Sequence, residues 1–396
     1  MADNTLITAG FLPLIDVSIL AAAREIGFAD AEGIELVLIR ESSWANVRDR
    51  MAIGHFDVAH MLAPMPIASN LGLTPFDTDI IAPMALGLGG NAITVSSALA
   101  ATLSPVPSGA LAAGAALKTH IDGLAESGDP KLKFGVVHPH SAHNFELRYW
   151  LAASGIDPDN AVEIVILPPS LMADALERGS IDGYCVGEPW NTLAQSRGSG
   201  QILATKNDIW ASSPEKVLGV DARWARKNAP ALAALIRALH DASLWCGEQG
   251  NLARLAEILS RPDYLGLDPE ILHASLTGPA GYEPHARAAT FPWQSHATWF
   301  YTQMVRWGQV AHQPSHVDVA RRTYRPDIYR EALKNAGAAI PAASSKVEGA
   351  LGAPTIVGAG RSMLQLGPDG FFDGEVFDPD HVDAYIARQR TRDGHD

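Results

Sequence analysis

Four widely separated segments of the sequence each carry one residue suited to holding a small anion. The segments are ESSWANVRD at 41–49, HPHSAHN at 138–144, IDGYCVGEPW at 181–190 and WASSPEK at 210–216, and the residues are Trp44, His143, Gly187 and Lys216. Indole and imidazole N–H groups donate hydrogen bonds, a glycine lets an anion approach backbone N–H groups closely, and an ammonium supplies positive charge. Together these groups can surround a planar anion without a nucleophile or a metal.

Each residue alone has a more ordinary interpretation: Trp44 packs in a core, Gly187 makes a tight turn, and Lys216 is solvated. Their positions favour the binding interpretation. Trp44 is expected at the carboxyl end of a strand, where ligands bind in α/β sheets. His143 is expected at a helix start, which favours an anion, and it can donate in its neutral or its protonated form. We expect Lys216→Ala to keep the fold intact and to weaken binding by ~1.5–3 kcal/mol.

Metal and enzyme sites are poorly supported by the sequence. His138, His140 and His143 lie within six residues, but no thiolate or carboxylate is spaced to complete a metal site. The segment GLGGNA at 87–92 does not meet G-x-G-x-x-G, and neither a G-x-x-x-x-G-K-[ST] phosphate loop nor a G-x-S-x-G elbow occurs. We therefore expect a binding protein with no catalytic residue, no metal and no cofactor.

Length and composition bound the class of protein. The 396 residues are 47% hydrophobic and 19% charged, which suits an ordinary globular chain with two lobes. A net charge of −14 disfavours direct nucleic-acid binding, and the apolar runs are too interrupted for a membrane span. The start, MADNTLITAGFLPL, lacks a basic leader and an apolar signal core, so we expect a cytoplasmic protein with Cys185 and Cys246 reduced.

Alternating strand and helix patterns predict an α/β fold. Strands are expected at 5–10, 35–40, 57–61, 93–97, 133–138, 163–167 and 183–187, and helices at 17–27, 44–53, 62–72, 143–155, 170–178 and within 222–260. The first strands should form a parallel β-α-β unit. The segment 341–360 is expected to be a long loop. We predict two lobes, the first from 1–95 plus about 215–396 and the second, inserted, from about 96–214, with the ligand in the cleft between them.

Several motifs resemble the nitrate-binding receptors of bacterial ABC importers and their cytoplasmic NasS-like sensor relatives. The similarity covers nearly the whole chain, in order and spacing, through SWANVRD, LAPMPIA, RYWLAASGIDP, LPPSLM, DGYCVGEPW, WASSPEK, YRPDIYREA and FFDGEVFDP. It implies a periplasmic-binding-protein-like (type II) fold in which Trp44, His143, Gly187 and Lys216 contact nitrate. Gly89 stands where importers carry a glutamine, and the resemblance leaves open whether Asn91 makes that contact instead.

The resemblance implies two roles for one ligand. A NasS-like sensor holds an RNA-binding ANTAR-type antiterminator (NasT-like) when ligand-free and releases it when nitrate or nitrite binds. The alternative is the receptor of an ABC importer. A bicarbonate-binding relative is disfavoured, because that branch has a carboxylate and a calcium ion at the position of Lys216. Thiamine-pyrimidine synthases share the fold but need a Cys-rich iron motif, which two scattered cysteines do not supply.

Overall fold

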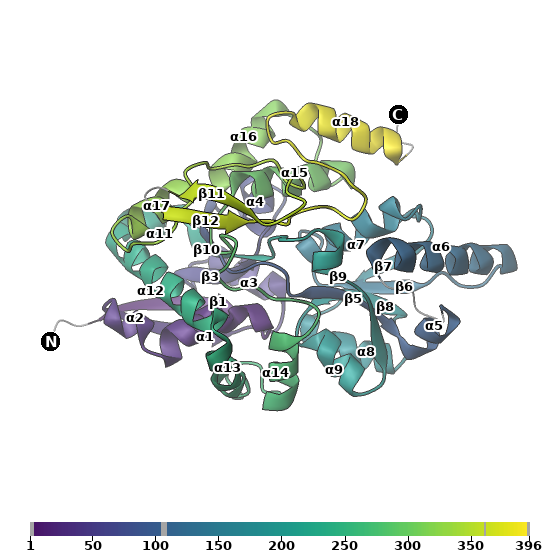
Figure 1. The fold of residues 1–396 in the computed structure, drawn as a ribbon, viewed down its shortest axis with the longest axis horizontal. Helices are drawn as coiled ribbons and strands as arrows, with labels where there is room; N and C mark the ends of the chain where they lie inside the picture. The colour runs from purple at the N-terminus through teal and green to yellow at the C-terminus, as the bar shows by residue number, and fades with distance from the viewer. Residues whose placement is uncertain (1–3, 104–108, 360–361, 394–396) are drawn as a thin grey trace.

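Two five-stranded sheets form the framework of the computed structural model, which describes residues 4–103, 109–359 and 362–393. The first sheet has the order β2-β1-β3-β10-β4, and the second has the order β7-β6-β8-β5-β9. Figure 1 shows the elements of the second sheet, in blue and teal, on one side of the molecule, and those of the first sheet on the other. The α/β fold class predicted from the sequence is confirmed.

In the sequence, the strands of the first sheet lie on both sides of those of the second, four before them and one after them. The first sheet contains β1 (Thr5–Phe11), β2 (Ile34–Arg40), β3 (Val58–Leu62), β4 (Ile80–Ala85) and β10 (Lys216–Asp221). The second contains β5 (Asn91–Ser96), β6 (Lys133–Val136), β7 (Glu163–Ile166), β8 (Gly183–Gly187) and β9 (Gly200–Thr205). Because β5 pairs with β8 and β9, the second sheet begins before residue 96. The exact residue limits of the two lobes remain a prediction.

Helices cover both sheets and build the carboxyl-terminal third of the chain. They are α1 (Ser18–Glu25), α2 (Phe28–Ala31), α3 (Trp44–Ala52), α4 (Met65–Asn70), α5 (Ser97–Thr102), α6 (Ala110–Ser127), α7 (Ala142–Ala153), α8 (Met172–Glu177), α9 (Trp190–Ser196), α10 (Lys206–Ile209), α11 (Ala222–Lys227), α12 (Ala229–Gly247), α13 (Leu252–Leu259), α14 (Pro269–Thr277), α15 (Gln294–Arg306), α16 (Pro314–Thr323), α17 (Pro326–Leu333) and α18 (Val382–Arg392). Short 3-10 turns occupy Ile15–Val17, Pro169–Leu171 and Gln249–Asn251. Over the described ranges, every helix is too short or too polar to cross a membrane.

The opening of the chain follows its sequence pattern closely. β1 and β2 pair in parallel, with Thr5 opposite Ile34, as the predicted β-α-β unit requires. The intervening helix stops before Gly27, whose φ of 93° lies in the left-handed region that glycine adopts without strain. Ser43 and Ser141 then cap α3 and α7, accepting from the backbone N–H groups of Asn46 and Asn144. These two caps fix the starts of the helices that carry the predicted site residues.

The pattern missed several elements, including the helices α6, α14, α15, α16 and α17. Strands β4 and β9 were not predicted, and β4 is an edge strand with Pro83 inside it, a residue that normally argues against a strand. The segment 341–360 is also not entirely a loop, so that prediction is wrong in part. β11 (Thr355–Ala359) pairs with β12 (Ser362–Leu366), and its inward side chains pack on the core of the first sheet. In Figure 1 this yellow-green hairpin lies over the first sheet, and α18 lies beside α15.

Candidate functional site

Seven titratable side chains are buried together near the strand ends of the two sheets. Each is at most 5% exposed as a residue, and they are Asp16, His60, His143, Glu146, Lys206, Glu215 and Lys216. Asp16, His60 and Lys216 come from the first sheet and the turn that follows β1. His143, Glu146 and Lys206 come from α7 and α10, beside the second sheet, and Glu215 immediately precedes β10. We call these seven residues the charge cluster.

Lys216 is the first residue of β10 and lies opposite Leu62, the last residue of β3. Its ammonium lies 2.8 Å from Asp16 Oδ2 and 2.8 Å from Glu215 Oε1, and its side chain is fully buried. The interpretation of Lys216 as a solvated residue is therefore excluded. It is also not a single free cation, because two carboxylates already share its charge.

A second lysine, Lys206, continues the chain of ion pairs. Its Nζ lies 2.6 Å from Glu146 Oε1 and 2.5 Å from Glu215 Oε2, and it donates to the carbonyl of Pro214 at 2.8 Å. Glu215 Oε2 also accepts from Asn91 Nδ2 at 2.6 Å. Glu215 thus joins both lysines to a residue of β5, and the ion pairs link the two sheets.

The surroundings shift the pKa values of the three carboxyl groups in different directions. Burial alone would raise the pKa of Asp16, but Lys216 and His60 hold it at about 2. Burial likewise opposes ionisation of Glu215, yet His143 and the two lysines keep its pKa below the ordinary range. Burial and the neighbouring Glu215 raise the pKa of Glu146 to about 7 despite Lys206. Glu146 is therefore the carboxyl group of the cluster that protonates most readily.

The two histidines of the cluster are neutral. Burial lowers the pKa of His143 to about 3, even though its Nδ1 lies 3.3 Å from Glu215 Oε1. Burial also lowers the pKa of His60, whose Nε2 lies 2.8 Å from Asp16 Oδ1. Across the described part of the chain, no three His, Cys, Asp or Glu side chains are arranged to hold a metal ion.

The structure brings five of the six predicted site residues to this cluster. Trp44 is 1% exposed, and Lys216 Nζ lies 5.4 Å from the centroid of its ring. A Cβ added at Gly187 would lie 3.2 Å from Asn91 Oδ1, which is a tight contact, and 3.7 Å from His143 Nε2, which is an ordinary one. Trp44, Gly187 and Asn91 thus surround the pair His143 and Lys216.

Gly89 lies elsewhere. Its backbone N–H donates to the carbonyl of Ser213 at 3.0 Å, and its φ of 71° favours glycine. A side chain at this position would meet the carbonyl of Gly281 and the amide of Asn207. The position therefore packs against the loop that follows α14, and the structure gives it no contact with Trp44 or Lys216 among the residues described.

Several buried polar atoms around Lys216 lack a hydrogen-bond partner within the described residues. They include Trp44 Nε1, His143 Nε2, His60 Nδ1 and Asn91 Oδ1. Leaving such a group unsatisfied costs about 1–3 kcal/mol, so a group of them in one place indicates a site for a small polar ligand. Indole and imidazole nitrogens beside an ammonium are suited to an anion.

Sequence reasoning missed Asp16, His60, Glu146, Lys206 and Glu215. Two signals could have found some of them. Glu146 lies three residues after His143 and so shares its helix face, and Glu215 directly precedes Lys216. The pairing of Asp16 with Lys216 spans 200 residues, and no local pattern announces it.

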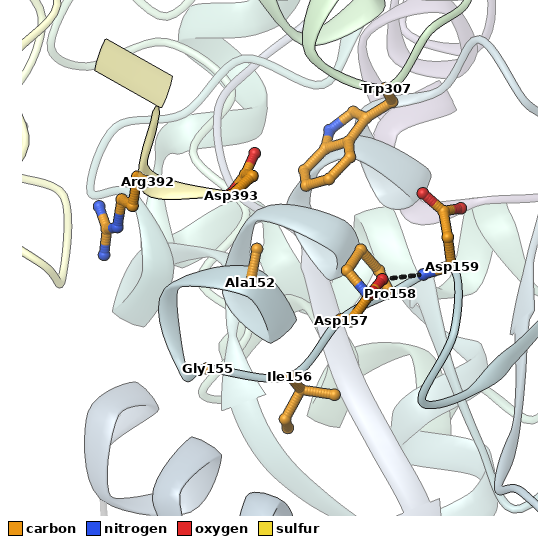
Figure 2. Close-up of a pocket in the computed structure, with 9 residues that line it drawn as sticks. All are labelled: Ala152, Gly155, Ile156, Asp157, Pro158, Asp159, Trp307, Arg392 and Asp393. Atoms are coloured by element: carbon orange, nitrogen blue, oxygen red, sulfur yellow. Dashed lines mark hydrogen bonds between the residues drawn. The ribbon is translucent and has the colours of Figure 1, made fainter. Parts of the chain in front are cut away.

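A separate pocket of about 190 Å³ lies at the other end of α7 (Figure 2). It is lined by Ala152, Gly155, Ile156, Asp157, Pro158, Asp159, Trp307, Arg392 and Asp393. His143 and Ala152 are nine residues apart on α7, which corresponds to about 13 Å along the helix axis. The charged groups here have partners of their own, for example Asp393 with Arg306 at 2.6 Å and Arg392 with Asp373 at 2.7 Å. The pocket is thus distinct from the charge cluster.

The chain is similar over nearly its full length to proteins of anion transport. It is 31% identical over 405 residues to the nitrate/nitrite binding protein NrtA of Synechococcus elongatus, covering 96% of this chain and 85% of that protein. It is 34% identical to the nitrate import ATP-binding protein NrtC and 32% identical to the bicarbonate transport ATP-binding protein CmpC, both of Synechocystis. These matches cover 96% and 95% of this chain but 54% of each relative, so the chain spans about half the length of NrtC and CmpC.

Structure comparison agrees with the sequence. The crystal structure of the periplasmic nitrate-binding protein NrtA from Synechocystis PCC 6803 matches with a TM-score of 0.84 at 26% identity, covering 97% of this chain and 98% of that one. The resemblance to periplasmic binding proteins predicted from the motifs is confirmed. The model of the NMT1-like family matches residues 2–260. The chain therefore belongs to the NMT1-like family and is homologous to the binding protein NrtA.

Proposed function

We propose that the chain binds one nitrate or nitrite ion beside Lys216 in the charge cluster. The observation that carries the proposal is the pair of buried, unpartnered nitrogens, Trp44 Nε1 and His143 Nε2, next to a buried ammonium. An anion there would accept hydrogen bonds from groups that otherwise remain unsatisfied. Because Gly187 has no side chain, none of its own atoms beyond the backbone of β8 stands between that strand and His143 Nε2.

The surroundings favour a small anion of single charge. A backbone hydrogen bond from Ile15 N–H to the carbonyl of Glu188, at 2.8 Å, joins the two sides of the molecule next to Asp16 and Gly187. Three buried carboxylates lie in the same cluster, so a dianion such as sulfate would meet stronger repulsion than nitrate would.

The choice between nitrate and bicarbonate does not follow from overall identity, because relatives named for either anion match about equally well. Lys216 supports nitrate or nitrite. The motif resemblance gives the bicarbonate branch a carboxylate and a calcium ion at this position, and the ammonium of Lys216 would repel that ion.

Calorimetric titration of the purified chain tests the proposal. Nitrate or nitrite should bind with one ion per chain, and chloride and sulfate should bind much more weakly. Bicarbonate should be added with and without calcium. Binding of bicarbonate with calcium, together with no binding of nitrate or nitrite, would overturn the assignment.

We further propose that the chain acts in the cytoplasm as a sensor for nitrate assimilation, holding an ANTAR-type antiterminator (NasT-like) when ligand-free and releasing it on binding. The support is that ligand-facing groups come from both sheets, Trp44 and Lys216 from the first and His143 and Gly187 from the second. A ligand that joins both sheets favours the closed arrangement, and a partner that prefers the open one would then be released. The second candidate is the receptor of an ABC importer, supported by the similarity to periplasmic NrtA.

Size-exclusion chromatography of the chain mixed with an ANTAR-type antiterminator separates the two roles. The sensor should co-elute with the antiterminator without nitrate and separate from it when nitrate is added. Absence of a complex, or a complex that nitrate leaves intact although calorimetry shows binding, would favour the importer receptor.

A further inference from the structure

The charge cluster has no positive charge to spare for an incoming anion. With neutral histidines, the two ammonium groups of Lys206 and Lys216 face the carboxylates of Asp16 and Glu215 and the carboxyl group of Glu146, whose pKa is raised to about 7. Each lysine already contacts two of these groups within 2.8 Å. A lysine that turned toward an anion would leave a buried carboxylate without its partner, at a cost of several kcal/mol.

His143 is the neighbour whose charge can change to meet the anion. Its ring is fully buried, Nδ1 lies 3.3 Å from Glu215 Oε1, and neither ring nitrogen makes a hydrogen bond within the described chain. Nε2 faces Gly187, at 3.7 Å from the position a Cβ would take there. The two nitrogens of one ring therefore face a carboxylate and the proposed anion position.

A neutral imidazole cannot satisfy both sides, because it has only one N–H. With the proton on Nδ1, the lone pair of Nε2 faces the anion. With the proton on Nε2, the lone pair of Nδ1 faces the Glu215 carboxylate. Only the imidazolium donates to both.

We propose that one proton enters the site together with the anion and resides on His143. This inference rests on the proposed function. The positive ring then lies between Glu215 and the bound ion, and the proton offsets the charge that the anion brings. Four charged groups face His143. They are Glu215, which precedes β10, Lys216 at the start of β10, Lys206 on α10 and Asp16 after β1. The two carboxylates stabilise the imidazolium and the two lysines oppose it.

Glu146 is the competing site for the proton. It lies on the same helix as His143. Its Oε1 lies 2.6 Å from Lys206 Nζ and accepts from the Ser213 hydroxyl at 3.0 Å. Protonation of Glu146 would also reduce the negative charge of the cluster. It would not, however, supply a second N–H on the His143 ring, which is why the geometry favours His143.

Uptake of a proton with the anion makes the affinity depend on pH. The complex holds one proton more than the free protein, so affinity for the anion should fall as pH rises, by up to about tenfold per pH unit while the proton is taken up. If His143 stays neutral and donates from Nε2, and Glu146 takes up no proton either, the affinity should be independent of pH between 6 and 8.

Calorimetry of the wild-type chain with nitrate, in PIPES and in Tris at one pH and matched ionic strength, counts the protons directly, because these buffers differ in ionisation enthalpy. Uptake of about one proton per nitrate is expected. ¹⁵N-NMR of the histidine rings should show His143 becoming doubly protonated when nitrate is added. His143→Gln should abolish the uptake, and Glu146→Gln should retain it whatever its affinity.

Three results would overturn the inference. Tight binding with heat independent of the buffer would exclude proton uptake and leave the proposed function standing. Uptake that persists in His143→Gln and disappears in Glu146→Gln would place the proton on Glu146. No binding of nitrate or nitrite at any pH would remove the proposed function and this inference with it. The NMR measurement needs only the wild-type chain, so a variant that fails to fold does not prevent the test.

Discussion

At the scale of one residue, Trp44 should contribute a hydrogen bond to ligand binding but none to the fold. Its indole N–H is buried and has no partner among the described residues, whereas the indole N–H of Trp150 donates to the carbonyl of Ala110 at 2.8 Å. Trp44→Phe therefore removes buried volume but no hydrogen bond of the fold, so it should cost less stability than Trp150→Phe. It should weaken nitrate binding by about 1.5–3 kcal/mol, the range for a hydrogen bond to a charged group. Calorimetry and urea unfolding measure the two effects.

Trp150→Phe is the matched control for that substitution. It leaves the buried carbonyl of Ala110 without its hydrogen-bond donor. The variant should lose about 1–3 kcal/mol of unfolding free energy, with no change in nitrate affinity. If Trp44→Phe keeps full affinity for nitrate, the indole does not contact the anion.

Lys216 behaves differently, because it holds two buried carboxylates. From the sequence we expected Lys216→Ala to leave the fold intact. Because Lys216 is buried between two carboxylates, we now expect any variant that removes its charge to destabilise the fold. Lys216→Met should lose about 3–5 kcal/mol of unfolding free energy at pH 7, since Asp16 and Glu215 then lack this partner. Adding Asp16→Asn should recover part of the loss.

Lys118→Met serves as the comparison for Lys216→Met. The Lys118 ammonium pairs with Asp122 at the surface, 2.5 Å away, and its removal should cost less than about 1 kcal/mol. Equal losses in the two variants, measured by urea unfolding, would show that the buried ion pairs contribute no more than a surface pair does.

The candidate site illustrates what sequence patterns can and cannot predict about individual residues. Trp44, His143, Gly187, Lys216 and Asn91 were all predicted, and the structure brings them together because helix caps and strand ends place them at one junction. Their binding roles remain a proposal. The partners of Lys216 could not be predicted, because Asp16 reaches it only through the pairing of β1, β3 and β10 in one sheet.

At the scale of elements, the junction between β8 and α9 makes a second pH-dependent contribution. Glu188 is 1% exposed, accepts from the Thr192 N–H at 3.0 Å, and burial raises its pKa from 4.5 to about 7. A carboxyl group whose pKa is raised in the folded protein contributes its full stabilisation at pH values below its pKa in the unfolded chain. That stability is lost as pH rises from about 4.5 to about 7, by roughly 3 kcal/mol in total.

Glu188→Gln should therefore be about as stable as the wild type near pH 4.5 and more stable near pH 7. The amide replaces the protonated acid and can still accept from Thr192. Thermal or urea unfolding across this pH range measures the difference. Parallel stability curves for the two proteins would show that Glu188 does not titrate with a raised pKa.

Elements were predicted well where composition and caps agree, and poorly where a single residue contradicts the pattern. The β-α-β opening, the starts of α3 and α7 and the strand β8 lie where the sequence indicates. Pro83 concealed β4, and the Gly- and Pro-rich composition near 341–360 concealed the β11–β12 hairpin. These strands depend on contacts with distant parts of the chain. β4 pairs with β10 more than 130 residues later, and the hairpin packs on the core of the first sheet.

At the scale of the whole molecule, polar contacts join the two sheets. Asn91 and Lys206, on the second sheet's side, both bond to Glu215, and Ile15 N–H donates to the Glu188 carbonyl. An anion between Trp44 and His143 would add to these contacts. Small-angle X-ray scattering should therefore show a smaller radius of gyration with saturating nitrate than with the same concentration of chloride. Identical profiles, with binding shown by calorimetry, would contradict ligand-driven closure.

The most direct test of the central claim is a crystal structure of the chain grown with nitrate. We expect planar density for one anion in contact with Trp44 Nε1 and His143 Nε2, beside the ammonium of Lys216 and next to Gly187. Density for nitrate at another place, or a buried cluster whose unpartnered nitrogens face only ordered water at saturating nitrate, would contradict it.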